Sequence, residues 1–299
     1  MSQIWRLQLK PWTEKNKEPR EILEFCKENN IIGVGWGQIR IRTHDYTTLR
    51  AEIDKIFPKA LKPLNAIWDM AINDLIYTRV DGNYYLCRVT KKWSDTKISE
   101  IHDDNGITNF VGVEIIKIGR EDSVPGKVVN SFRSTSAVQR VNYVDRISKL
   151  IWNKHSGSGF EYPEEPIVKE DFWQSINSEE LEGLILLYLQ AKGYFVYSTT
   201  LKPSTTVYEC VMIMNDGSHK CYPQVKSGDE PLDGNDYESL LDNKSDKVFL
   251  FALSQNYYKS NNYQIEYLAL TDVEVFIREN KRILPEPVLH WVNLCSELN

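Results

Sequence analysis

The stretch that decides the fold is residues 209–226, ECVMIMNDGSHKCYPQVK. The segments VYECVMIM and HKCYPQVK are predicted strands joined by NDGS, and Asp-Gly is among the strongest short-range signals of a β-hairpin. With the Asp216–Gly217 pair at the centre of the turn, counting outward places Glu209 directly opposite Gln224, so the two side chains are predicted to share a face. Lys226 follows on that face because side chains along a strand alternate with period two.

This placement predicts a carboxylate, an amide and an ammonium grouped at one end of a mostly apolar hairpin. Glu209, Gln224 and the backbone carbonyl of Val225 supply oxygen ligands that suit Mg²⁺ or Mn²⁺ with several waters retained. Lys226 is predicted to position or deprotonate an attacking water, or to neutralise charge on a phosphate. Glu182, in the helix before the sheet, is the candidate second acid. The alternative is an exposed Glu–Lys pair with Gln as filler, which contributes little to stability.

The second half of the chain predicts the element order α-β-β-β-α-β-β-α, an α/β layer domain. Its helix LEGLILLYLQAKGY, the following strand, Glu209 and the tripeptide QVK together resemble the PD-(D/E)XK nuclease superfamily, in particular the Mrr-like restriction endonucleases. The resemblance covers roughly residues 175–280. It implies a restriction-endonuclease-like α/β/α fold around a central mixed sheet and a Mg²⁺-dependent endodeoxyribonuclease activity. Glu182 matches the helix acid, Glu209 the acid of the second strand, and Gln224 and Lys226 the QxK pair.

Three features depart from the family pattern. Glu stands at position 209, where Asp is usual, and the acidic stretch GDEPLDGND follows the motif. Pro223 lies inside a predicted central strand, where it removes a ladder hydrogen bond; if it marks a bulge, the predicted register shifts by one residue. These departures leave open a second interpretation, a catalytically inactive nuclease fold that binds nucleic acid or a protein partner.

The first half predicts many short strands with a few helices, which is typical of a small, curved β-barrel with helical additions. The clearest element is a hairpin with strands at residues 75–80 and 83–90 around an Asp-Gly turn. GKVVNSF, residues 126–132, is predicted to be a strand. Residues 136–152 are predicted to form one amphipathic helix.

Segments of this half resemble PUA-like modules, the group that includes the EVE and SRA base-recognition domains: GVGWG, the 75–90 hairpin and VPGKVVNSF. The resemblance implies nucleic-acid binding, with a flipped, modified base held in an aromatic-walled pocket. Trp36, between glycines, is the first candidate wall; Trp93, Trp68, Tyr84 and Arg79 are further binding candidates. The alternative is that these aromatic residues belong to the core. PUA-like domains also bind RNA, so an RNA-binding or RNA-processing protein is a third interpretation.

Charge and composition suggest where the chain divides. Residues 1–152 hold 24 Lys+Arg and 19 Asp+Glu, whereas residues 153–299 hold 12 and 23. A basic half joined to an acidic half indicates that the first half meets a polyanion, although ordinary surface variation gives the same balance. Residues 153–171, rich in Gly, Ser, Pro and acids, are the predicted linker, between a recognition domain (1–152) and a nuclease-like domain (172–299). A recognition module joined to a nuclease predicts a modification-dependent restriction enzyme that defends against foreign DNA.

Other sequence features favour a cytoplasmic protein. The N-terminal residues lack the apolar segment and the cleavage site of a signal peptide, and no apolar run approaches the roughly 20 residues that span a bilayer. The 5 cysteines are scattered, which suits a reducing compartment and argues against a disulfide framework or zinc site. A double-strand cut needs two active sites, so a homodimer is compatible with the enzyme interpretation.

Overall fold

The computed structural model describes residues 2–9, 17–36, 43, 45–96, 106–201, 208–241 and 243–298. Contacts divide the chain into two compact units, Met1–Pro166 and Ile167–Asn299. Within the described ranges, no helix is both long and apolar enough to cross a bilayer.

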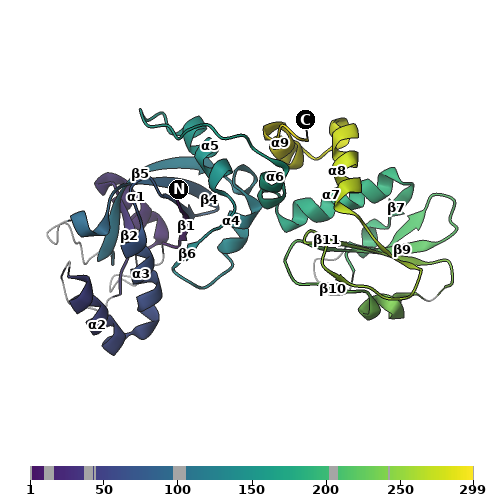
Figure 1. The fold of residues 1–299 in the computed structure, drawn as a ribbon, viewed down its shortest axis with the longest axis horizontal. Coiled ribbons are helices and arrows are strands. Elements are labelled where there is room, and N and C mark those ends of the chain that lie inside the picture. Colours follow the sequence, from purple (N-terminus) through teal and green to yellow (C-terminus); the bar gives the residue numbers. More distant parts are fainter. Residues whose placement is uncertain are drawn as a thin grey trace. The chain divides into compact units, whose positions relative to one another are not determined.

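The N-terminal unit contains a six-stranded sheet that curls into a half-barrel (Figure 1). Its strand order is β2-β5-β4-β3-β1-β6, with β1 and β3 parallel and the other neighbours antiparallel. The strands are β1 Ile4–Leu7, β2 Ile31–Val34, β3 Leu75–Val80, β4 Asn83–Lys91, β5 Asn109–Gly119 and β6 Val138–Arg140. The helices are α1 Pro19–Asn29, α2 Tyr46–Ile56, α3 Leu61–Asp69, α4 Gly126–Ser131 and α5 Asp145–His155. The predicted barrel is therefore open, because β2 and β6 are the two ends of the sheet and do not pair in the described residues.

Helices cover both faces of this half-barrel. Apolar residues of α1, α2 and α3, such as Leu23, Ile53 and Leu64, share one buried cluster with the sheet. On the other face, the hydroxyl of Tyr77 in β3 donates to Ser148 Oγ in α5 over 3.0 Å, and both residues are fully buried. The 75–90 hairpin has the predicted strands and turn.

Two predictions for this unit are wrong. Residues 126–131 form helix α4, not a strand: Val128 and Val129 are buried on a short turn that follows Pro125, so packing overrides their β propensity. The predicted helix over residues 136–152 is shorter, because residues 138–140 instead pair with β1 as an antiparallel edge strand. The helix begins at Asp145.

The segment after α5 packs against the N-terminal unit. The Arg88 guanidinium lies 4.1 Å from the ring centroid of Phe160, and donates to Glu114 Oε2 over 2.8 Å and to Asn73 Oδ1 over 2.7 Å. Tyr162 donates its hydroxyl to the carbonyl of Asn73 over 2.7 Å. Residues 153–171 thus include the end of α5, a packed segment, and the beginning of the next helix.

We expect Arg88→Ala to destabilise the N-terminal unit by about 2 kcal/mol, because it removes both the packing surface under Phe160 and the hydrogen bonds to Asn73 and Glu114. Urea unfolding measures the loss, and protease cleavage between residues 157 and 165 should become faster. The matched control is Glu114→Gln. Its carboxylate is 42% exposed, so its loss should change stability by less than about 1 kcal/mol. Equal effects of the two variants would contradict the packing role.

The C-terminal unit is a mixed five-stranded sheet with helices, in strand order β13-β11-β9-β8-β7. Its strands are β7 Tyr194–Val196, β8 Met212–Met214, β9 Lys220–Lys226, β11 Lys247–Ala252 and β13 Ile265–Tyr267, with β10 Leu232–Asp233 and β12 Tyr257–Tyr258 forming a separate pair. Its helices are α6 Lys169–Ser175, α7 Ser178–Ala191, α8 Leu270–Glu279 and α9 Glu286–Leu294, with a 3₁₀ segment, η7, at Gly234–Leu240. Figure 1 shows α7 and α8 on one side of the sheet and β10 on the other.

The direction of pairing changes at β9. Strands β7, β8 and β9 form an antiparallel meander, whereas β11 pairs with β9 in parallel. On one face of β9 and β11, Tyr222, Leu250 and Ala252 belong to an apolar cluster with Tyr237 of η7. This arrangement leaves the end of β9, at residues 224–226, beyond the last paired residue of β8.

Candidate functional site

Helix α7 carries Glu182 toward one end of the sheet. The helix begins with a capping box: Asn177 Oδ1 accepts from Glu180 N over 2.9 Å, and Glu180 Oε2 accepts from Asn177 N over 2.8 Å. It ends before Gly193, whose φ of +98° favours glycine. Leu181 and Ile185 are buried, so the helix is fixed and Glu182 lies half-buried in its first turns.

The hairpin register is as predicted near the turn and shifts by one at Glu209. Met212 pairs with Cys221 and Ile213 with Lys220, as counting from the turn requires. Glu209 N, however, donates to the carbonyl of Pro223 over 2.9 Å. Glu209 therefore lies opposite Pro223, and the predicted direct opposition to Gln224 is wrong.

Proline explains where this ladder ends. The carbonyl of Pro223 points toward the β8 side, and proline has no N–H to return a second hydrogen bond there. On its other edge, β9 keeps its pairing with β11 from Cys221 to Lys226. Tyr208 packs on Tyr222, and the next residue, Glu209, directs its carboxylate to the edge of β9.

The Glu209 carboxylate takes the place of the missing ladder partner. Its Oε1 accepts from the N–H of Val225 over 3.2 Å, so the carboxylate lies at the unpaired edge of β9. Burial raises the pKa of Glu209, and the Val225 hydrogen bond opposes this shift. A half-buried carboxylate at a strand edge is a ligand position open to a cation.

Glu182 and Glu209 interact as like charges. The pKa of Glu182 is raised to about 7, first by burial, then by the charge of Glu209 and then by that of Glu179. In the described part of the chain, neither Glu182 nor Glu209 forms an ion pair with Lys or Arg. Two half-buried acids without a counter-charge are unfavourable when both are ionised, and a bound cation would remove that penalty.

Gln224 and Lys226 project from the same face of β9, as predicted. In register they neighbour Leu250 and Ala252, whose side chains lie in the apolar cluster on the η7 side. Gln224 Oε1 is buried without a hydrogen-bond partner. Lys226 Nζ is 3.3 Å from Glu230 Oε2, and 85% of the Glu230 side chain is exposed. The structure thus brings Glu209 close to Glu182 and to the backbone of Val225, whereas the side chains of Gln224 and Lys226 project on the η7 face and the ammonium of Lys226 contacts Glu230.

The donor set fits a divalent cation that prefers oxygen. In the described part of the chain, no three His, Cys, Asp or Glu side chains come together as a metal site. The available donors are two carboxylates, the unpartnered Oε1 of Gln224 and the carbonyl of Val225, which accepts a hydrogen bond from Gln224 Nε2 over 3.4 Å. Mg²⁺ binds through few carboxylates and keeps several waters, so this sparse set suits it better than it suits Zn²⁺.

Tyr237 of η7 is a neighbour of Glu209 that no sequence feature singles out. Burial raises the pKa of its hydroxyl, and the charges of Asp236 and Glu209 add to the rise. The protonated hydroxyl therefore lies close enough to Glu209 to sense its charge. Only the three-dimensional packing of η7 against the sheet reveals it, since no motif spacing links positions 209 and 237.

The candidates in the N-terminal unit separate into core and surface residues. Trp93 is 2% exposed and donates its indole N–H to Asn109 Oδ1 over 3.3 Å, and Tyr84 is 1% exposed. Trp36 is half-buried and packs on the apolar cluster under the sheet. Trp68 is 40% exposed, with its ring centroid 4.3 Å from that of Tyr46. Trp93, Tyr84 and Trp36 thus contribute to packing, and Trp36 does not line the pocket at Arg79.

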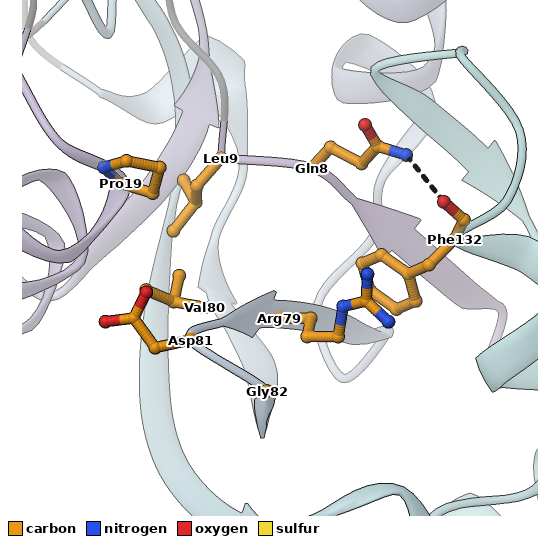
Figure 2. A pocket seen from close by; sticks show the side chains of 8 residues that line it. All are labelled: Gln8, Leu9, Pro19, Arg79, Val80, Asp81, Gly82 and Phe132. Atoms are coloured by element: carbon orange, nitrogen blue, oxygen red, sulfur yellow. Dashed lines mark hydrogen bonds between the residues drawn. The ribbon is translucent and has the colours of Figure 1, made fainter.

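Arg79 lies on a pocket of about 410 Å³ at the end of β3 (Figure 2). The lining residues are Gln8, Leu9, Pro19, Arg79, Val80, Asp81, Gly82 and Phe132. Gln8 Nε2 donates to the carbonyl of Phe132 over 3.2 Å and to that of Ser134 over 2.7 Å, which fixes the wall on the α4 side.

Comparison of the chain with protein-family models, with curated proteins and with solved structures gave no match.

Proposed function

We propose that the C-terminal unit is a metal-dependent nuclease of the PD-(D/E)XK type that hydrolyses DNA phosphodiester bonds with Mg²⁺ or Mn²⁺. One observation carries the proposal: Glu182 and Glu209, half-buried and without a counter-charge in the described chain, interact as like charges, and Glu209 accepts from the N–H of Val225 at the edge of β9. Helix α7, the meander β7-β8-β9 and the parallel strand β11 belong to a mixed sheet with helices, and the family resemblance implies a sheet of this kind.

In this proposal, Glu182, Glu209, Gln224 and the carbonyl of Val225 hold the cation. When bound, Mg²⁺ supplies charge neutralisation at the phosphate and lowers the pKa of a bound water. Hydrolysis joins a water oxygen to phosphorus and breaks the bond from phosphorus to one ester oxygen, which leaves as a hydroxyl after taking up a proton. The protein's own groups must orient the phosphate and balance its charge.

Lys226 has the second role in this mechanism. Its ammonium lies two residues beyond Gln224 on the same face, and its ion pair with Glu230 is largely solvent-exposed and therefore weak. A phosphate that enters the site can replace the Glu230 carboxylate as the partner of Lys226. The residue would then stabilise negative charge on the phosphate as the ester bond breaks.

The N-terminal unit is the proposed recognition module, a PUA-like fold that places the scissile DNA. Arg79 is exposed on its surface, and the excess of basic residues in this half supports phosphate contacts. A recognition module joined to a nuclease suits a restriction enzyme that acts on modified foreign DNA in the cytoplasm. A homodimer of this enzyme would supply the second active site that a double-strand cut needs.

A second candidate function is nucleic-acid or partner binding without catalysis. The register shift at Pro223 and the Lys226–Glu230 pair favour it, since both move the polar groups away from the arrangement predicted from the motif. RNA in place of DNA is a variant of either proposal.

The experiment that tests the proposal is cleavage by the full chain of plain, methylated and hydroxymethylated duplex DNA and of single-stranded RNA, with Mg²⁺, Mn²⁺ or EDTA. We expect metal-dependent cleavage of duplex DNA that falls at least tenfold in Lys226→Ala. Absence of cleavage on every substrate, together with no binding of Mn²⁺ by calorimetry, would favour the binding function. If the chain cleaved RNA alone, the proposed substrate would be RNA instead of DNA, and the proposed metal site would stay the same.

A further inference from the structure

The pocket beside Arg79 has opposite charges at its two ends. Figure 2 shows the guanidinium of Arg79 beside the ring of Phe132, whereas the carboxylate of Asp81 points toward Pro19, away from Arg79. Arg79 and Asp81 form no ion pair with each other. Leu9 and Val80 line the space between them. The pocket therefore offers a cation, an apolar middle and an anion in sequence.

At the positive end of the pocket, the charge of Arg79 is not balanced by a protein anion in the described residues. The Arg79 guanidinium lies 5.4 Å from the Phe132 ring centroid, and that of Arg6 lies 5.5 Å from the same centroid. Arg79 donates only a long hydrogen bond, 3.4 Å, to the hydroxyl of Tyr84. In the described chain no carboxylate pairs with either arginine.

Arg6 adds a second positive charge near the Phe132 ring. It is fully buried, it donates to the carbonyl of Ser136 and, over 2.9 Å, to Gln139 Oε1, and its Nε has no partner. Burial lowers the pKa of Arg6 to about 10, so the group stays charged at neutral pH. Two guanidinium groups around one aromatic ring attract an anion, and the exposed one, Arg79, can form paired hydrogen bonds with a carboxylate or phosphate.

We propose that this pocket binds a small organic molecule that carries a phosphate or carboxylate at one end and an amino group at the other. The anion lies against Arg79, the body of the molecule packs on Leu9, Val80 and Phe132, and the amino group faces Asp81. A pocket of about 410 Å³ falls within the range of ordinary small-molecule sites, roughly 300–1,000 Å³. The inference stands independently of the proposed metal site, because it uses no residue of the C-terminal unit; with the proposed recognition module it shares Arg79 alone.

The test is calorimetric titration of the full chain with matched probes. Deoxycytidine 5′-monophosphate has both an anion and an amine, deoxycytidine lacks the anion, and deoxyuridine 5′-monophosphate lacks the amine. A carboxylate with an amine, 4-aminophenylacetate, shows whether the site takes nucleotides or carboxylates. We expect the probes with both groups to bind at least tenfold more tightly than those with one.

Two substitutions assign the ends. Arg79→Gln should weaken the binding of anionic probes about tenfold and leave deoxycytidine unchanged. Asp81→Asn should weaken the probes that carry an amine and leave deoxyuridine monophosphate unchanged. Asp81 has φ +51° in a hairpin turn, where Asn before Gly is favoured, so this variant keeps the backbone.

Three results would overturn the inference: no probe binds to the folded wild-type chain below about 1 mM, the charged and uncharged probes bind equally, or binding survives Arg79→Gln. None of these results bears on metal binding or cleavage at Glu209, so the failure of one proposal is distinguishable from the failure of the other.

Discussion

Glu209→Gln is expected to lower the rate of Mg²⁺-dependent DNA cleavage at least a hundredfold while the fold is retained. The substitution removes one of two carboxylates at the site and leaves too little negative charge to hold the cation. An amide oxygen in the same position can still accept from the N–H of Val225, the 3.2 Å hydrogen bond that closes the edge of β9. Single-turnover cleavage gives the rate, and circular dichroism with thermal melting shows that the sheet is intact.

The control for this prediction is Glu230→Gln, which removes the same charge from the carboxylate that pairs with Lys226. Glu230 is exposed and pairs with Lys226, so its loss should leave cleavage unchanged or raise it by releasing the ammonium. If Glu209→Gln and Glu230→Gln lowered cleavage equally, the effect would come from the general charge of this surface. If Glu209→Gln cleaved as fast as the wild type, the carboxylate would have no part in the reaction.

The sequence predicted the hairpin well because its turn dictates its own register. The NDGS turn fixes the pairing of Met212 with Cys221, and alternation then places Gln224 and Lys226 on one face. At Pro223 the same counting fails. Proline signals a lost hydrogen bond, but the sequence does not say which neighbouring strand its missing N–H faces, and that side decides where Glu209 goes.

The remaining errors have related physical causes. Val128 and Val129 favour a strand by propensity, yet their burial beneath a short turn makes them helical, which only tertiary packing can decide. Trp93 and Tyr84 look like binding residues in a list of aromatic side chains, but both are core. Conversely, the pocket at Arg79 joins β3 and its turn to the start of α1 and to the residues that directly follow β1 and α4, and no local pattern in the sequence brings Gln8 to Phe132.

The second large effect concerns stability, because the surroundings of Glu182 disfavour the ionised form of its carboxyl group. Its pKa is about 7 in the folded chain against an ordinary value of 4.5, since burial and the charge of Glu209 both favour the protonated form. A raised carboxyl pKa means that the folded state binds the proton more tightly than the unfolded state. Stability from this group is therefore complete below about pH 4.5 and is lost as the pH rises through 7.

Glu182→Gln removes the titrating group. In EDTA, the stability of the variant relative to the wild type should therefore increase as the pH rises from 5 to 8. After allowance for solvent screening at a half-buried site, a gain of about 1 kcal/mol corresponds to roughly 3 °C in Tm at pH 8, with little difference at pH 5. Differential scanning calorimetry at both pH values measures it. The control is Glu179→Gln on the same helix. Its exposed carboxylate interacts favourably with the helix dipole and is the smallest of the three causes that raise the pKa of Glu182, so its loss should stabilise far less than Glu182→Gln.

At pH 8, Mg²⁺ should make the Tm of the wild type higher than that of Glu182→Gln. A cation that binds only the folded chain adds stability by mass action, so millimolar Mg²⁺ should raise the Tm of the wild type at pH 8, where Glu182 and Glu209 are ionised. At pH 5 the added stability should shrink, since protons compete for the same oxygens. Glu182→Gln should lose most of the response and Glu179→Gln should keep it. If Mg²⁺ left the Tm of the wild type unchanged at pH 8, Glu182 and Glu209 would not form a metal site.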